Sequence, residues 1–86
     1  MGYKLLFDKK ALKDLKKIDA VWQKKILKTI NEKIVNNPHA GKHLVGDWSP
    51  FFRWRIGDYR IIYDINNDTV VIEIIRIRHR KDVYDH

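Results

Sequence analysis

The feature that most restricts the fold of this chain is a β-hairpin signal around Gly57-Asp58. These two residues separate the segments FFRWRI and YRIIYDI, which are both rich in aromatic and β-branched residues. A two-residue connection with glycine first is typical of a type II′ turn, which fixes the residues that face each other across the hairpin. The sequence therefore predicts that Arg55 pairs with Arg60 and that Trp54 pairs with Ile61.

Side-chain alternation along these two strands separates charge from hydrophobic surface. Because successive side chains of a strand point to opposite faces, Arg53, Arg55 and Arg60 share one face of the hairpin. The other face is expected to pack on the core, and it carries Phe52, Trp54, Ile56, Tyr59 and Ile61. We therefore predict a cationic site on the face that the core does not use.

An arginine directly opposite another arginine is unfavourable in a purely structural hairpin, since facing like charges destabilise a sheet. Guanidinium groups bind phosphate in bidentate fashion, so the cluster suits a phosphate-bearing partner. The alternative is a solvated face with local ion pairs, for which Asp64 and Glu73 are the nearest acids in this register.

The remaining segments predict one small α+β domain that uses the whole chain, residues 1–86. A strand over residues 3–7 is followed by Asp8 as the N-cap of an amphipathic helix over residues 9–19. A second helix is predicted over residues 20–36, where large apolar side chains recur every four positions. We expect the two helices to form an antiparallel hairpin.

The second half of the chain predicts a loop and then strands. Residues 38–50 have loop composition with a brief extended piece at residues 43–45. Asn67-Asp68 is expected to be the central pair of a turn into a third antiparallel strand over residues 70–78. The predicted order is β-α-α-β-β-β, with the helical hairpin on one face of an antiparallel sheet.

Charge and composition restrict the classes of partner and of functional site that are expected. The net charge of +7 favours nucleic acid first, and it leaves anionic membranes and acidic proteins open. The absence of cysteine excludes disulfides and thiolate metal sites, and the four histidines lack a metal-binding spacing. The chain begins with no apolar run long enough for a signal peptide or a membrane span, so an intracellular protein without membrane association is expected.

Lysine and arginine are segregated along the chain. All six arginines lie between Arg53 and Arg80, whereas eleven of the twelve lysines precede residue 43. This predicts a solvated lysine face on the helices and a separate arginine-built site. The last segment, RIRHRKDVYDH, is either a mobile basic tail or an ordered one that folds across the sheet.

Several of these segments resemble those of a known family. The run WRIGDYRIIYDI, followed by an acidic turn, an apolar strand and RHRKDVY, is similar to the C-terminal half of RelE/ParE-type toxins from toxin-antitoxin modules. The expected order of helices and strands is also similar, so the resemblance spans nearly the whole chain. Its most specific segment is KHLVGDWSPFFRWRIGDYR.

The resemblance implies a cytoplasmic toxin that is neutralised by a cognate antitoxin. In RelE-like members the toxin cuts messenger RNA in the ribosomal A site by attack of the 2′-hydroxyl on the adjacent phosphorus, with no metal or other cofactor. It implies that the partners are the ribosome and the messenger, with 16S ribosomal RNA contacts through the lysine-rich helices.

The resemblance also assigns roles to particular residues. Arg60 and Arg55 are expected to neutralise the phosphorane oxygens, Tyr84 or His79 to accept the 2′-hydroxyl proton, and Arg80 or His79 to assist the leaving oxygen. The expected catalytic residues are therefore Arg60, Arg80 and Tyr84, which match family positions, and His79, an extra candidate that some relatives lack. The expected RNA- and phosphate-binding residues are Arg53 and Arg55, which match family positions, and Arg78 and Arg76 of the basic last segment.

Two other functions stay open on the sequence. ParE-like members of the same family poison DNA gyrase, and an inactive member could serve as an RNA-binding or corepressor module. Stacking on bases would favour a binding module, but Trp54 and Tyr59 belong to the predicted core face. Trp48 and Phe51 are the possible exceptions.

Overall fold

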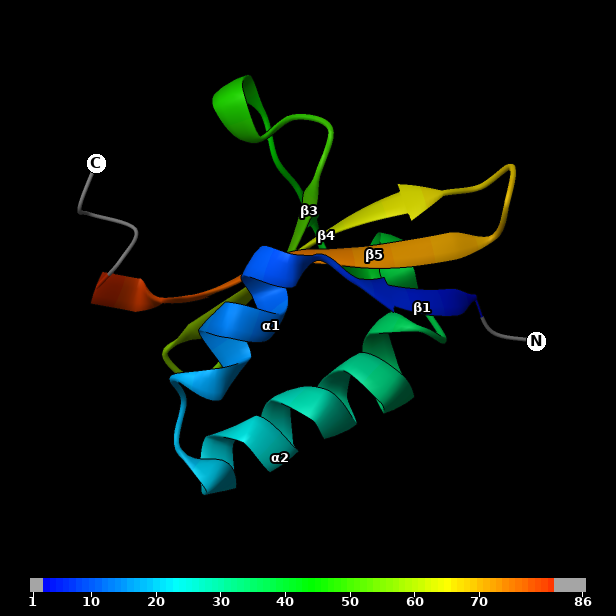
Figure 1. The fold of residues 1–86 in the computed structure, drawn as a ribbon. Coiled ribbons are helices and arrows are strands. Elements are labelled where there is room, and N and C mark those ends of the chain that lie inside the picture. The colour runs from blue at the N-terminus through cyan, green and yellow to red at the C-terminus, as the bar shows by residue number, and fades with distance from the viewer. Residues whose placement is uncertain (1–2, 82–86) are drawn as a thin grey trace.

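The structure, a computed structural model, describes residues 3–81 and contains a five-stranded sheet with two helices packed against it (Figure 1). The strands are β1 (Lys4–Phe7), β2 (Lys42–His43), β3 (Phe52–Ile56), β4 (Tyr59–Asn66) and β5 (Val71–His79). The helices are α1 (Lys9–Lys16) and α2 (Ala20–Thr29), with a π-helical turn at Ile30–Ile34 and 3-10 turns at Pro38–Ala40 and Gly46–Trp48. This arrangement confirms the predicted α+β class.

The sheet is mixed rather than wholly antiparallel. Its strand order is β1-β5-β4-β3-β2, and β1 pairs with β5 in parallel while the other pairs are antiparallel. The short strand β2 extends the opposite edge from within the predicted loop. The direction of β1 could not be predicted because its partner strand lies more than sixty residues away, as in the pair Lys4 and Val71.

Each helix begins at a carboxylate cap. Asp8 accepts a hydrogen bond from the backbone N–H of Lys10, and Asp19 accepts one from that of Trp22. The first helix is shorter than predicted and ends at Lys16, where the Gln23 side chain donates to the carbonyl oxygens of Leu15 and, just beyond the helix, Ile18. The second predicted helix corresponds to α2 together with the π-helical turn that follows it and ends at Ile34.

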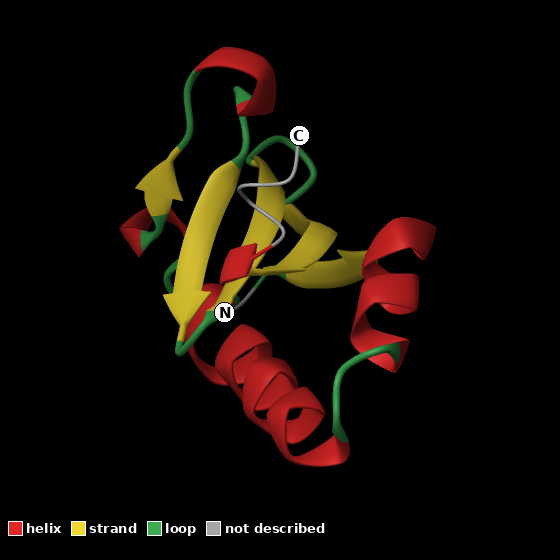
Figure 2. Cartoon of the chain, turned by 90° about the vertical axis from the view of Figure 1, so that its left-hand side faces the viewer, coloured by secondary structure: helices red, strands yellow, loops and turns green. Residues whose placement is uncertain are grey.

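The two helices open at a wide angle, and each packs on a different part of the sheet (Figure 2). The face of α2 and its π-helical turn buries Ile26, Ile30 and Ile34 against the sheet residues Tyr63 and Ile74. By contrast, α1 lies against β5 at the edge that β1 leaves uncovered. No helix within residues 3–81 is long and apolar enough to cross a membrane.

The predicted register of the β3–β4 hairpin is confirmed. Arg55 faces Arg60 and Trp54 faces Ile61. Gly57 has a φ of 56°, and Asp58 is not among the residues with positive φ, as a type II′ turn requires. A side chain at Gly57 would also collide with the indole of Trp22, so this position tolerates only glycine.

The predicted register of the β4–β5 turn is wrong. Asn66 faces Val71, so the loop has four residues instead of the central pair Asn67-Asp68. The Asn66 side chain holds this longer loop by accepting the backbone N–H groups of Asp68 and Thr69. A register shift between Ile62 and Tyr63 then displaces the two strands further.

Candidate functional site

Three arginines lie side by side across the face of the sheet that α2 does not cover. Arg55 of β3 faces Arg60 of β4, and Arg60 in turn faces Arg78 of β5. We call these three residues the arginine row. Two cross-strand pairs of like charge lie in succession here, which destabilises the sheet unless an anion is bound.

Arg60, at the centre of the arginine row, has two buried nitrogens without a hydrogen-bond partner in the described part of the chain. Its Nε and Nη1 atoms are inaccessible to solvent, and no acceptor within residues 3–81 forms a hydrogen bond with them. A buried donor without a partner costs free energy, and most such groups in native proteins are satisfied. An anionic ligand that gained access to these nitrogens would supply the acceptors that they lack.

The acids that could have neutralised this face lie elsewhere. Asp64 and Glu73 face each other farther along β4 and β5. Within residues 3–81, neither carboxylate is within ion-pair distance of an arginine. Asp64 and Glu73 therefore do not supply the local ion pairs that the alternative required.

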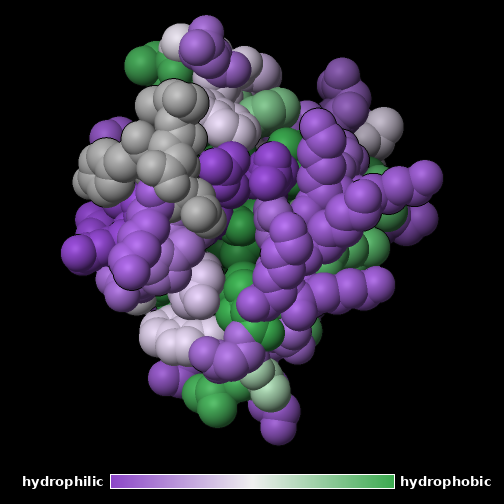
Figure 3. Space-filling model, turned by 60° about the vertical axis from the view of Figure 1, so that its left-hand side comes forward, coloured by the Kyte–Doolittle hydropathy of each residue, from purple (hydrophilic) through white to green (hydrophobic). Residues whose placement is uncertain are grey.

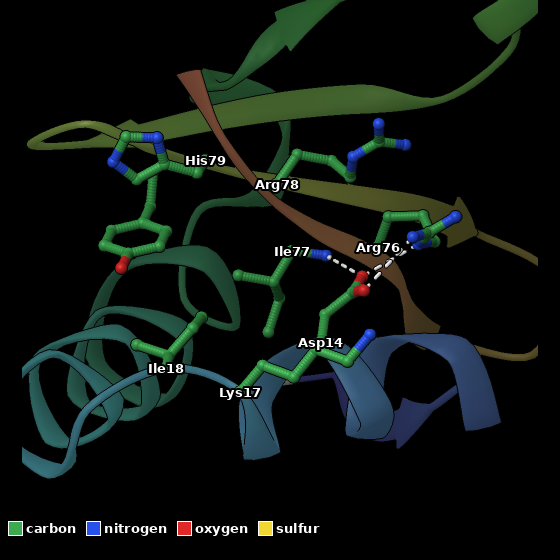
Figure 4. Close-up of a pocket in the computed structure, with 8 residues that line it drawn as sticks. Asp14, Lys17, Ile18, Arg76, Ile77, Arg78 and His79 are labelled. Atoms are coloured by element: carbon green, nitrogen blue, oxygen red, sulfur yellow. Dashed lines mark hydrogen bonds and ion pairs between the residues drawn. The ribbon is translucent and has the colours of Figure 1, made fainter. Parts of the chain in front are cut away.

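Arg53 and Arg76, two of the predicted phosphate-binding residues, have different surroundings. Arg53 lies two positions before Arg55 on the same face and is opposite Lys42 of β2, which extends the positive charge. Arg76 instead forms a bidentate ion pair with Asp14 of α1, with Nε–Oδ2 and Nη2–Oδ1 distances of 2.7 and 3.1 Å (Figure 4). The charge of Arg76 is thus partly compensated by α1.

Asp14 also binds a backbone N–H group at the edge of β5 that β1 leaves uncovered. Its Oδ2 atom accepts the backbone N–H of Ile77 at 3.0 Å, just beyond the point where β1 ends. Burial acts to raise the pKa of Asp14, but the hydrogen bonds from Arg76 and Ile77, together with the positive charges of Arg76 and Arg78, outweigh it and lower the pKa below its ordinary value. Asp14 is the only acid among residues 9–17, which was the signal in the sequence that this residue differs from its neighbours.

The predicted residues at the end of β5 are spread over both faces of the sheet. His79 faces Tyr59 on the helix-covered side, with the two rings edge to face at 5.1 Å. Arg80 lies beside the β3–β4 turn, where its backbone N–H donates to the carbonyl of Asp58 at 2.7 Å and its side chain lies 3.7 Å from the Asp58 carboxylate. Tyr84 lies outside the described residues.

A pocket of about 420 Å³ lies between α1 and the edge of β5 (Figure 4). Its lining residues include Lys17 from the end of α1 and Arg78 and His79 from β5. Figure 3 shows that hydrophilic side chains cover most of this side of the molecule and leave only a narrow apolar strip between them. The site is therefore a shallow cationic surface rather than an enclosed apolar cavity.

Comparison with known proteins gives consistent matches over nearly the whole chain. The sequence model of a protein family, described as the ParE toxin of the type II toxin-antitoxin system parDE, matches residues 5–84. Toxin RelE3 of Methanocaldococcus jannaschii is 32% identical over 87 residues, covering 96% of this chain and 97% of that protein.

Solved structures of toxin-antitoxin complexes share the fold. The RelBE2 complex from Mycobacterium tuberculosis matches with a TM-score of 0.87 and 26% identity, covering 93% of this chain and 100% of the matched chain. The RelB-RelE complex from Methanococcus jannaschii matches with a TM-score of 0.70 and 34% identity, covering 94% and 96%. The chain therefore belongs to the RelE/ParE family of toxins from type II toxin-antitoxin systems.

Proposed function

We propose that this toxin is a ribosome-dependent endoribonuclease that cuts messenger RNA in the A site and acts in the cytoplasm. The observation that carries the proposal is the arginine row, in which buried nitrogens of Arg60 have no partner among the residues that the structure describes. A site that concentrates positive charge in one row suits the developing negative charge of a phosphoryl-transfer transition state.

The proposed reaction is an internal transfer of the phosphoryl group. The 2′-hydroxyl attacks the adjacent phosphorus, a 2′,3′-cyclic phosphate forms, and the bond to the 5′-oxygen of the next nucleotide breaks. Arg60 would bind the non-bridging oxygens from the centre of the row, and Arg55 and Arg78 would bind them from either side. Positioning and charge stabilisation would then supply most of the rate.

The 2′-hydroxyl must lose a proton, and the leaving 5′-oxygen must gain one. We propose Tyr84, which lies outside the described residues, as the base, because the family resemblance implies this role for it. His79 is the weaker candidate because it packs on Tyr59 on the opposite face and its Nδ1 accepts the backbone N–H of Lys81. Arg80, which is largely exposed, would assist the leaving oxygen.

The proposed protein partner is a cognate antitoxin. Solved relatives of 26% and 34% identity are complexes of a RelE toxin with a RelB antitoxin. An acidic segment of such a partner would neutralise the arginine row by charge complementarity. The exposed lysines of α1 and α2, such as Lys13 and Lys24, would contact 16S ribosomal RNA.

Toeprinting on a translated message with the purified toxin tests the proposal directly. We expect new stops at A-site codons that require ribosomes and that disappear when antitoxin is added. Naked messenger RNA should be left intact under the same conditions. Ribosomes that translate the message without any A-site cut would contradict the proposed activity.

The second candidate function is inhibition of DNA gyrase, favoured by the match to the ParE toxin model. It predicts DNA breaks that depend on gyrase and no cleavage of messenger RNA. A plasmid cleavage assay with purified gyrase, run beside the toeprint, separates the two activities. A third outcome, binding without either activity, would favour a corepressor module.

A further inference from the structure

The uncovered face of the sheet divides into two branches beyond the arginine row. The last pair between β3 and β4 is Phe52 with Tyr63, and there the two strands part. β3 continues with β2 into a projecting loop, whereas β4 and β5 continue together toward their own turn (Figure 1). RNA that leaves the arginine row can follow either branch.

The β2–β3 branch carries positive charge and an aromatic ring on this face. Lys42 faces Arg53, and the backbone N–H of Leu44 donates to the carbonyl of Phe51 at 2.9 Å, which continues the same register by two residues. Because side chains alternate, Phe51 lies on the same face as Arg53. Phe51 is partly exposed there.

The β4–β5 branch carries the opposite charge. Asp64 and Glu73 face each other on it, and with Leu6 of β1 they line a hollow of about 350 Å³. The hollow on the other branch, about 230 Å³, is instead lined by Lys42 and Arg53. A polyanion is repelled by the first hollow and attracted by the second.

We propose that single-stranded RNA leaves the arginine row along β3, past Arg53 and Lys42, and that one of its bases stacks on the ring of Phe51. This inference rests on the proposed function, and it adds a path and a base-binding residue to it. Cationic grooves of single-strand-binding proteins combine phosphate contacts with aromatic rings in this way, and stacking is tolerant of sequence. Phe51 is thus a nucleobase platform and the arginine row a phosphate clamp.

The test compares two probes by fluorescence anisotropy with the full-length toxin. One probe is a short single-stranded RNA, and the other is an oligomer of the same length with abasic riboses at every position. Phe51→Ala is expected to raise the Kd of the base-bearing RNA about tenfold and to leave the Kd of the abasic oligomer unchanged. Arg60→Ala is expected to weaken both probes to the same extent.

Two further variants distinguish the effect of the aromatic ring of Phe51 from the effect of its size. Phe51→Tyr should bind as the wild type does, whereas Phe51→Leu, which keeps an apolar side chain in the loop, should lose the preference for bases. Retention of the full preference in Phe51→Leu would overturn the inference. If Arg60→Ala has no effect on either probe, the proposed phosphate binding by the arginine row is wrong, regardless of the results for the Phe51 variants.

Discussion

The two faces of strands β3, β4 and β5 use alternate residues of the same segments for opposite purposes. On the helix-covered face the aromatic rings are packed and partnered, as where Tyr59 lies 5.4 Å from Trp22 and Tyr63 donates to the carbonyl of Pro38 at 2.6 Å. On the open face, Arg60 lies between two other arginines, and its buried donors have no partner within residues 3–81. The difference indicates that the covered face provides stability, and it supports our proposal that the open face serves binding at some cost in stability.

At the edge of β5, by contrast, Arg76 is an arginine with a structural role. Arg76 lies only two residues before Arg78, yet a carboxylate from α1 binds it in bidentate fashion. Asp14 thereby links the helices to the strand that carries one member of the arginine row. The contrast between Arg76 and Arg60 can be tested one residue at a time.

The largest effect is expected from Arg60→Ala. Loss of the central guanidinium should lower the rate of A-site cleavage about 100-fold or more, which is the usual cost of removing a donor to a developing oxyanion. The free energy of unfolding should stay the same or rise, because two like-charge pairs are removed. Single-turnover cleavage on programmed ribosomes and urea unfolding measure the two quantities.

Lys4→Ala is the matched control, since it removes one positive charge from the exposed edge strand β1, away from the arginine row. It should leave the cleavage rate within about twofold of the wild-type rate, because exposed charges beyond a Debye length are screened. If Arg60→Ala destabilises the protein, the assignment of the open face to binding is wrong.

The next largest effect is expected from Asp14→Ala, and it concerns stability. This change removes a charged hydrogen-bond acceptor shared by Arg76 and the backbone of Ile77, at a cost of about 2 kcal/mol in unfolding free energy. Asp47→Ala, in the exposed loop before β3, is the control and should cost almost nothing. Equal losses for the two variants in urea unfolding would argue against a structural role of Asp14.

Sequence reasoning located the open face correctly because its determinants are local. The two-residue turn at Gly57 fixes the register of β3 with β4, and alternation then fixes which face each arginine occupies. The same alternation separates His79 from Arg78, but the sequence interpretation treated this segment as a tail, either mobile or folded across the sheet. Alternation continued through β5 would have placed His79 correctly.

Two other parts of the site could not be predicted, because they depend on contacts that local sequence patterns do not reveal. A two-residue turn after Asn66 would have put Arg60 across from Ile75, whereas the longer loop and the register shift put it across from Arg78. The hydrogen bond from Ile77 to Asp14 joins residues 63 positions apart. Such contacts follow from how α1 packs on the sheet edge, which periodicity alone does not specify.

A smaller effect is expected on the covered face from Tyr63→Phe. The variant removes the hydroxyl donor to the carbonyl of Pro38, which keeps only the longer hydrogen bond from the Gly41 backbone N–H at 3.4 Å, and should lose about 1 kcal/mol of unfolding free energy. Burial raises the pKa of Tyr63 to about 12 from 10.0, so its folded form resists ionisation. Wild-type stability should therefore fall as the pH rises above 10, and less so in Tyr63→Phe, in unfolding measured by circular dichroism.

The smallest effect is the acid dependence of the Asp14 pair, measured against Asp14→Asn. Because the pKa of Asp14 is lowered from 3.8 in the folded state, its contribution is fully present above 3.8 and is lost as the pH falls through the folded value. The difference in unfolding free energy between wild type and Asp14→Asn should therefore shrink as the pH is lowered below 3.8. A difference that stays constant across this range would mean that packing rather than charge holds α1 to β5, and it would remove the contrast between Arg76 and the arginine row.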